Sequence, residues 1–182
     1  MQKLRLILEK LSEFTGNTIA WLTLAMVLVT FVVVVLRYAF DMGWIAMQES
    51  VTWMHAAVFM LGAAYTLKCD EHVRVDIFYR KLSSRNRAIV DLAGTLVFLL
   101  PMAGFLVVAS WDYVSTSWAI RESSREAGGL PFPFVPILKS LIPATAVMLV
   151  LQGVADSLGA ILSLTGRAVP AEGEKVSAGD VI

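Results

Sequence analysis

Four long stretches without charged residues dominate the chain. Residues 15–36, 50–67 and 92–111 contain no Asp, Glu, Lys or Arg, and residues 140–155 form a fourth, shorter stretch. A helix needs about 20 mostly apolar residues to cross a hydrocarbon core of about 30 Å. The pattern therefore predicts an all-α membrane protein with four transmembrane helices, placed at residues 15–37, 49–68, 88–112 and 138–164.

The segments between and beyond these spans carry the charges. In residues 1–14 the apolar residues recur at helical spacing, with charged residues on the other faces. This is typical of a short amphipathic helix at the membrane surface, and a second one is expected after the second span, around residues 72–78. A continuation of the first span as one longer helix is an open alternative for residues 1–14. The tail, residues 167–182, is polar and is predicted to be disordered in the cytoplasm.

Composition agrees with a membrane protein of one domain. The chain has 182 residues, of which 57% are hydrophobic and 16% charged. The net charge is zero, which gives no indication of nucleic-acid binding. Because Cys69 is the single cysteine, no intrachain disulfide can form, and membrane thiol oxidoreductases, which use cysteine pairs, are disfavoured. The first apolar stretch is too long for a cleavable signal peptide and is interpreted as a signal anchor.

The distribution of Lys and Arg predicts the orientation. With both termini in the cytoplasm, the cytoplasmic segments carry 11 basic residues and the opposite segments carry four. Short cytoplasmic connections are enriched in Lys and Arg. We therefore expect an N-in, C-in topology, with residues 68–87 cytoplasmic and the loop between Arg121 and Lys139 periplasmic.

Charged side chains lie near the ends of the first three spans rather than at their centres. Charge at a helix centre costs about 2.5–3.5 kcal/mol on insertion scales. Arg37 ends the first span and Glu49 begins the second, on the same side of the membrane. We expect these two residues to pair with each other or with polar groups of a partner. This distribution is typical of a packing element and not of a proton relay, an ion pathway or an enzyme.

The two histidines exclude a haem or metal site that both would ligate within one chain. His55 and His72 are 17 residues apart, which is about 25 Å along a helix. The sequence also shows no nucleophile–base set, glycine-rich phosphate loop or acidic metal cluster. No cofactor, metal ion or catalytic residue is therefore expected.

Several short motifs follow one another in a recognisable order. Arg37-Tyr38-Ala39-Phe40, Trp44 and Glu49 are followed by Phe59-Met60-Leu61-Gly62-Ala63-Ala64 and by Glu71-His72-Val73-Arg74-Val75-Asp76. Gly128-Gly129-Leu130-Pro131, Lys139-Ser140-Leu141-Ile142-Pro143 and Leu151-Gln152-Gly153 come later. In this order, and with four spans, residues 10–165 resemble the small membrane subunit (Q-type) of tripartite ATP-independent periplasmic (TRAP) transporters.

The resemblance implies a role that the residues alone do not show. It implies a non-catalytic scaffold subunit, in the phospholipid bilayer of the bacterial inner membrane, of a sodium-coupled secondary transporter for small organic acids. The implied partners are a large membrane subunit, which carries the substrate and sodium sites, and a periplasmic solute-binding protein. A cofactor-free anchor of a membrane enzyme complex and a small homo-oligomeric transporter remain the alternatives. The candidate interface residues outside the periplasmic loop are Arg37, Tyr38, Glu49, Trp53, His72 and Asp76.

The loop before the fourth span offers the remaining interface candidates. Residues 128–136 combine two glycines, three prolines and exposed apolar side chains, and apolar side chains on a presented loop are typical interface anchors. A turn that dips into the lipid headgroups is the alternative interpretation. Our hypothesis is that this loop helps the binding protein to dock, with its flanking charges tuning the orientation. The residues concerned are Arg121, Glu122, Arg125, Glu126, Gly129 and Pro131.

Overall fold

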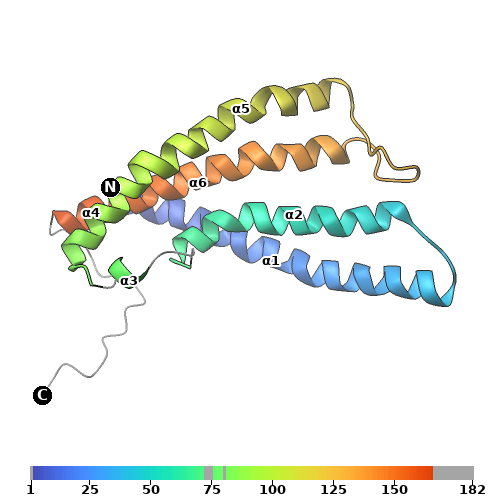
Figure 1. The fold of residues 1–182 in the computed structure, drawn as a ribbon, viewed down its shortest axis with the longest axis horizontal. Helices are drawn as coiled ribbons and strands as arrows, with labels where there is room; N and C mark the ends of the chain where they lie inside the picture. Colours follow the sequence, from blue (N-terminus) through green and yellow to red (C-terminus); the bar gives the residue numbers. More distant parts are fainter. Residues whose placement is uncertain (1, 72–75, 80, 166–182) are drawn as a thin grey trace, which may run out of the picture.

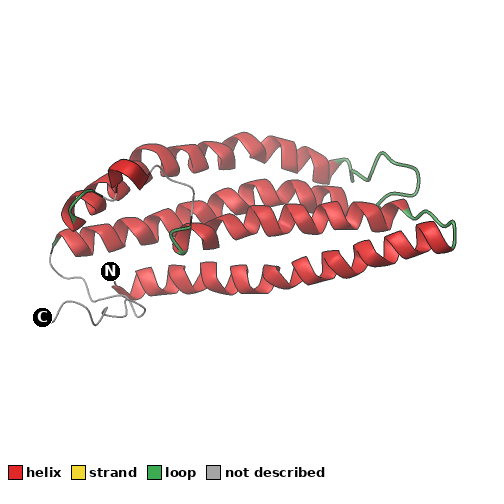
Figure 2. Cartoon of the chain, turned by 60° about the horizontal axis from the view of Figure 1, so that its bottom comes forward, coloured by secondary structure: helices red, strands yellow, loops and turns green. Residues whose placement is uncertain are grey.

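The chain folds into a bundle of long helices (Figures 1 and 2). A computed structural model describes residues 2–71, 76–79 and 81–165. The elements are α1 (Gln2–Ala39), α2 (Ile45–Lys68), α3 (Asp76–Tyr79), α4 (Ser84–Gly94), the π-helical segment η1 (Thr95–Leu99), α5 (Leu100–Ala119) and α6 (Phe134–Leu164). Within the described residues every regular element is helical. The expected disordered tail and most of the second expected interfacial segment lie outside these residues.

The prediction of four spanning helices is confirmed. α1, α2, the continuous helix Ser84–Ala119 and α6 are each long and apolar enough to cross a membrane. They run alternately up and down, so the N-terminus, α3 and the start of α4 lie at one end of the bundle (Figure 1). The connections 40–44 and 120–133 lie together at the other end, which we call the loop end. This alternation places the connections 40–44 and 120–133 on one side of the membrane.

α1 is longer than the first expected span. Residues 2–14 continue into it without a break, so α1 has 38 residues and a length of about 57 Å at 1.5 Å per residue. The buried residues of this helix are Ser12, Gly16 and Ile19. The apolar side chains that suggested a surface helix point outward, and Phe14 is 71% exposed. The first half of α1 therefore faces the bundle mainly with small and polar residues such as Ser12 and Gly16.

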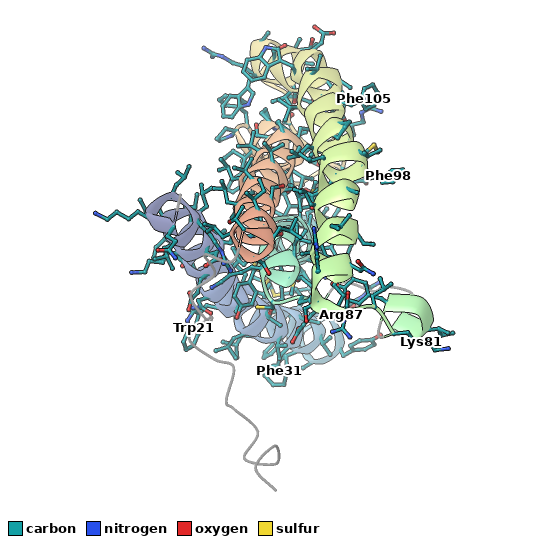
Figure 3. The ribbon with its side chains drawn as sticks, turned by 90° about the vertical axis from the view of Figure 1, so that its left-hand side faces the viewer. Trp21, Phe31, Lys81, Arg87, Phe98 and Phe105 are labelled. Atoms are coloured by element: carbon teal, nitrogen blue, oxygen red, sulfur yellow. The ribbon has the colours of Figure 1, made fainter. Side chains whose placement is uncertain are left out.

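Small and polar residues fill the interior of the bundle. The most deeply buried positions include Ala64, Ala103, Ala155 and Gln152. Large apolar side chains instead point away from the bundle, as Figure 3 shows for Trp21, Phe31, Phe98 and Phe105, all more than 60% exposed. A hydrocarbon solvent provides no drive to bury apolar groups, so membrane helices meet on small residues that permit close approach. This distribution is the one expected of helices surrounded by lipid.

α6 is the central helix of the bundle. It packs against α1, α2, α4 and α5, whereas α5 packs mainly on α6 and on η1, which precedes it. The fully buried Gln152 joins α6 to α1, because its Oε1 accepts a hydrogen bond from Ser12 Oγ (2.7 Å). Its Nε2 donates to Asp156 Oδ1 (2.9 Å) one turn further on. Two consecutive hydrogen bonds through Gln152 thus link Ser12 of α1 to Asp156 of α6.

A π-helical turn precedes Pro101 in the third span. The Leu100 N–H bonds to the Thr95 carbonyl, five residues earlier, where an α-helix would use residue 96. Proline has no N–H, and its ring crowds the carbonyl four residues before it. The π turn Thr95–Leu99 is wider than an α-helical turn and includes that carbonyl, at Val97. η1 faces α6 at Gly153, where a Cβ would lie 2.8 Å from Leu99 Cδ2. The π turn before Pro101 therefore also packs on α6.

A pair of matched substitutions tests the close contact between α1 and α2. A Cβ added at Gly16 would lie 2.7 Å from Tyr65 Cβ, whereas one added at Gly104, also inside a helix, meets nothing within 4 Å. We expect Gly16→Ala to separate the two helices and to destabilise the bundle by about 1–3 kcal/mol, as overpacking does. Gly104→Ala should raise stability by up to about 1 kcal/mol through helix propensity. Unfolding of the purified variants in mixed micelles measures both effects, and a Gly16→Ala variant as stable as wild type would contradict the contact.

Candidate functional site

The loop end is the most structured polar region of the described chain. α5 ends at Ala119, and Arg121 follows in the left-handed region (φ 50°). The Glu122 N–H then bonds back to the Ser117 carbonyl (3.1 Å), which closes the helix end. Gly128, also at positive φ (81°), lets the chain reverse before it enters α6. These two turns give the segment 120–133 a defined path across the ends of the helices.

Glu49 attaches this segment to α2. Its Oε2 accepts a hydrogen bond from the Leu130 N–H (2.7 Å), and its Oε1 accepts one from Ser124 Oγ. The Ala46 N–H, in the first turn of α2, donates to the Gly128 carbonyl (3.1 Å). The Glu49 side chain and the Ala46 backbone therefore hold the loop against the first turns of α2.

Gly129 is required by this arrangement. A Cβ at position 129 would lie 2.7 Å from Ser124 Cβ and 2.9 Å from Glu49 Oε1. The backbone approaches these groups so closely that only glycine leaves room for the Glu49 carboxylate. The sequence pattern marked Gly129 as an interface candidate, and the structure gives it a role inside the chain.

A second polar cluster joins α5 to α6 beneath the loop. Glu122 Oε2 accepts hydrogen bonds from Ser117 Oγ (2.6 Å) and from Lys139 Nζ. Lys139 Nζ also lies 4.0 Å from the centroid of the Tyr113 ring, within the range of a cation–π contact. The hydrogen bonds from Lys139 and Ser117 lower the pKa of Glu122 below its usual value. Glu122 therefore stays charged and turned towards the bundle.

Aromatic side chains complete the loop end. Trp53 of α2 meets Phe134 of α6 edge to face, with ring centroids 5.9 Å apart. Trp118 of α5 meets Phe132 of the loop at the same distance, and its Nε1 donates to Ser140 Oγ (3.0 Å). Edge-to-face pairs of this kind add about 0.5–1.5 kcal/mol beyond the area they bury. The first pair joins α2 to α6, and the second joins α5 to the loop.

The interface candidates from the sequence separate into two groups. Glu49, Trp53, Glu122 and Gly129 build the loop end from within, as described above. The others expose their side chains at this end: Arg37, Tyr38, Arg121, Arg125, Glu126 and Pro131. His72 and the side chain of Asp76 lie outside the described residues.

The expected pair between Arg37 and Glu49 does not form within the described part of the chain. Both oxygens of the Glu49 carboxylate are taken by the loop, and Arg37 is exposed at the end of α1. The loop offers backbone N–H and hydroxyl donors at fixed positions, whereas a pair with an exposed arginine costs the entropy of a long side chain. Sequence reasoning missed Ser124 and Lys139 as partners, because both lie far from their carboxylates along the chain.

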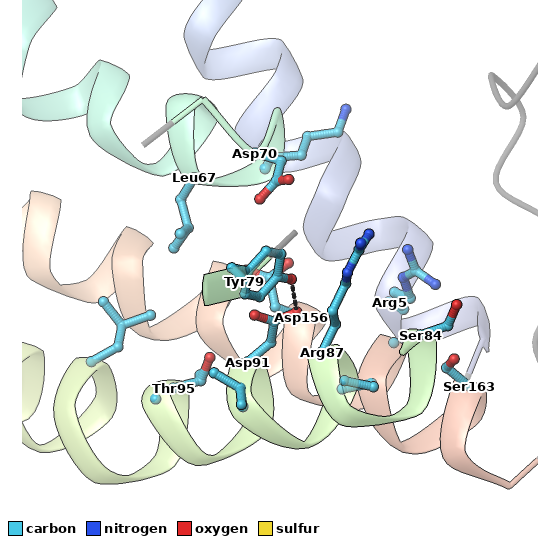
Figure 4. Close-up of a pocket in the computed structure, with 17 residues that line it drawn as sticks. Arg5, Leu67, Asp70, Tyr79, Ser84, Arg87, Asp91, Thr95, Asp156 and Ser163 are labelled. Carbon is cyan, nitrogen blue, oxygen red and sulfur yellow. Dashed lines mark hydrogen bonds between the residues drawn. The ribbon is translucent and has the colours of Figure 1, made fainter. Parts of the chain in front are cut away.

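A pocket lies at the opposite end of the bundle. It has a volume of about 770 Å³ and is lined by residues of α1, α2, α3, α4 and α6. Figure 4 shows Arg5, Arg87, Asp91 and Asp156 around it, with the Tyr79 hydroxyl donating to Asp91 Oδ2 (2.6 Å). Its wall carries both arginines and carboxylates. Within the described residues, no group of three or more His, Cys, Asp or Glu side chains is arranged to hold a metal ion.

Comparison with known families assigns this architecture. Residues 26–162 match the family model described as "Tripartite ATP-independent periplasmic transporters, DctQ component". The chain belongs to this family. As a DctQ component it is a part of a transporter, which disfavours the enzyme-anchor alternative, and it is a multi-pass protein of the bacterial inner membrane. The matched residues include Glu49, the whole loop 120–133 and Gln152.

One curated relative gives the same assignment to the DctQ component. The C4-dicarboxylate TRAP transporter small permease protein DctQ of Vibrio cholerae serotype O1 is 32% identical over 112 residues. The matched region covers 58% of this chain and 47% of that protein. It therefore spans about half the length of the relative.

The attachment of the loop to α2 can be tested by removing its parts. Glu49→Ala should destabilise the loop end by about 1–3 kcal/mol, because two donors lose a charged acceptor. Gly129→Ala should act in the same direction through the clash described above. Tryptic cleavage after Arg125 in the folded protein should become faster in both variants. Ser123→Ala, which removes an exposed hydroxyl from the same loop, is the matched control, and cleavage at equal rates in all four proteins would contradict the attachment.

Proposed function

We propose that this chain is the non-catalytic scaffold subunit of a sodium-coupled, binding-protein-dependent secondary transporter for small organic acids. In this proposal it supports a large transport subunit within the phospholipid bilayer and helps to dock the periplasmic binding protein. The observation that carries the proposal is the loop 120–133, which Glu49 and the Glu122–Lys139 pair hold in place while its outer charges stay exposed.

The arrangement of helices supports the scaffold part of the proposal. Because α6 occupies the centre, α2 and α5 lie on different sides of it and the bundle is broad (Figure 1). Both outer helices present apolar side chains, such as Phe59 (76% exposed) and Val108 (77% exposed), to their surroundings. A broad apolar side suits contact with a large polytopic subunit. The polar groups that the structure buries, such as Gln152, join helices of this chain to one another.

The loop supports the docking part. Partners that meet through complementary charges associate faster, and the exposed charges at the rim of such an interface set the rate and its dependence on salt. Arg125 and Glu126 are exposed on the loop, whereas Glu122 faces inward. A held loop loses little conformational entropy when a partner binds, which favours affinity. The family's periplasmic component is the partner that this surface would meet.

Docking is tested by reversing the exposed charges. The large subunit and the binding protein are first identified by co-purification with this chain, and the three components are reconstituted in vesicles. The double variant Arg125→Glu, Glu126→Lys should raise the binding-protein concentration needed for half-maximal uptake several-fold while the membrane complex stays assembled. Arg85→Glu, an exposed reversal at the other end of the bundle, is the control. Uptake that is unchanged at limiting binding protein would remove the docking role, and sodium-driven uptake by this chain alone would remove the scaffold role.

The orientation belongs to the same proposal. The 11-to-4 distribution of basic residues predicts that the loop end faces the periplasm and that both termini face the cytoplasm. Cys69, exposed just after α2 at the opposite end, is a natural probe. A membrane-impermeant thiol reagent should leave it unlabelled in intact spheroplasts and should label it after the membrane is opened. Labelling in intact spheroplasts would reverse the topology.

A further inference from the structure

The C-terminal ends of α2 and α5 have the same hydrogen-bond motif but different residues at its left-handed position. After α2, the Asp70 N–H bonds to the Leu67 carbonyl and the Glu71 N–H to the Thr66 carbonyl. After α5, the Arg121 N–H bonds to the Trp118 carbonyl and the Glu122 N–H to the Ser117 carbonyl. Both are Schellman ends, in which the residue past the cap adopts the left-handed conformation. Asp70 has φ 59° and Arg121 has φ 50°.

Arginine is a poor choice for this position. A Cβ crowds the backbone in the left-handed region, so glycine is preferred there, and Asp or Asn are tolerated because their short side chains bond locally. The positive-φ residues elsewhere in the described chain follow this rule, since they are Asp41, Asp70 and Gly128. Gly128 lies in the same loop as Arg121. Arg121 therefore occupies a site where the backbone alone would favour glycine.

The contacts among the described residues do not explain this arginine. Two nearby carboxylates are already engaged, Glu122 by Lys139 and Ser117, and Glu49 by the loop. Glu126, five residues later, is itself exposed. Arg121 is exposed, with Arg125 four residues further along the same loop. Residues kept in strained backbone conformations cluster at binding and switch sites. The observation thus points to a contact outside the chain.

We propose that Arg121 is a fixed recognition point for a carboxylate on the docking binding protein. The Schellman bonds fix the backbone from which its side chain starts, and its guanidinium offers paired N–H donors that match a carboxylate. Trp118, one turn earlier, marks the level of the aromatic belt at the membrane surface, and Arg121 lies beyond it along the chain. This inference rests on the docking role proposed above and names the residue and the partner group within it.

The test uses substitutions with opposite effects on folding and on recognition. Arg121→Gly should relieve the backbone and raise the melting temperature of the purified chain by about 2–4 °C. The same substitution should raise the binding-protein concentration for half-maximal uptake several-fold and make uptake less sensitive to salt. Arg121→Lys keeps a charge but not the paired donors, and should recover part of the affinity without the gain in stability. Asp70→Gly, the same change at the matched helix end, should leave uptake unchanged.

The outcomes separate this inference from docking in general. If the Arg125, Glu126 double reversal weakens uptake but Arg121→Gly does not, docking stands and the role of Arg121 is overturned. A second outcome would show that the arginine holds a lipid phosphate. In that case Arg121→Gly weakens uptake only in vesicles that contain anionic phospholipid, and the binding protein binds the complex in phosphatidylcholine nanodiscs as tightly as before. The proposal would then be wrong. Higher stability together with weaker direct binding supports it.

Discussion

The inward surface of α6 is the feature on which the other helices depend. Hydrocarbon does not drive apolar side chains together, so helices in a membrane associate through close packing and a few polar contacts. α6 provides both, with Ala146 and Ala155 fully buried and Gln152 bonded to Ser12 of α1. Gly153 admits the π turn before Pro101, and Gly159 admits the Arg5 guanidinium, whose Cζ would lie 3.1 Å from an added Cβ. Five neighbouring elements, α1, α2, α4, η1 and α5, therefore pack against one helix.

The organisation of the loop end follows from that packing. Because α2 and α5 both contact α6, the first turn of α2 and the last turn of α5 are held at fixed separation. Glu49 reaches the loop from α2, and Lys139 of α6 reaches Glu122 beyond the end of α5. Each carboxylate bonds to donors more than 15 residues away along the chain. The loop is thus stabilised by the bundle rather than by local turns alone.

The two ends of the bundle suit different tasks. The loop end pairs Glu122 with Lys139 and exposes Arg121, Arg125 and Glu126, and its aromatic pairs join α5 to the loop and α2 to α6. The opposite end holds the ion pair between Lys68 and Glu13 (2.8 Å) and the polar pocket beside Asp91. Between them, the buried Gln152 bonds to Ser12 and joins α6 to α1. For a DctQ component, the apolar outer sides of the helices are consistent with a place within the membrane.

The sequence by itself determined the class of fold, because the length of an uncharged stretch is compared directly with the thickness of a bilayer. Four spans, the absence of charge from the centres of the first three, and the order of motifs from Arg37 to Gln152 were all readable along the chain. Tertiary structure decided the partners of the polar residues. The sequence left open whether residues 1–14 form a separate surface helix or continue the first span, and α1 runs from Gln2 to Ala39 with Ser12 bonded to Gln152 of α6. Glu49 lay beside Arg37 in the expected topology, but its acceptors face Ser124 and Leu130, 75 and 81 residues later. Helical periodicity shows which residues share a face of one helix. Which helix packs against that face depends on how closely the two helices can approach. That distance is set by the small residues on both helices at once, so a single stretch of sequence does not reveal it.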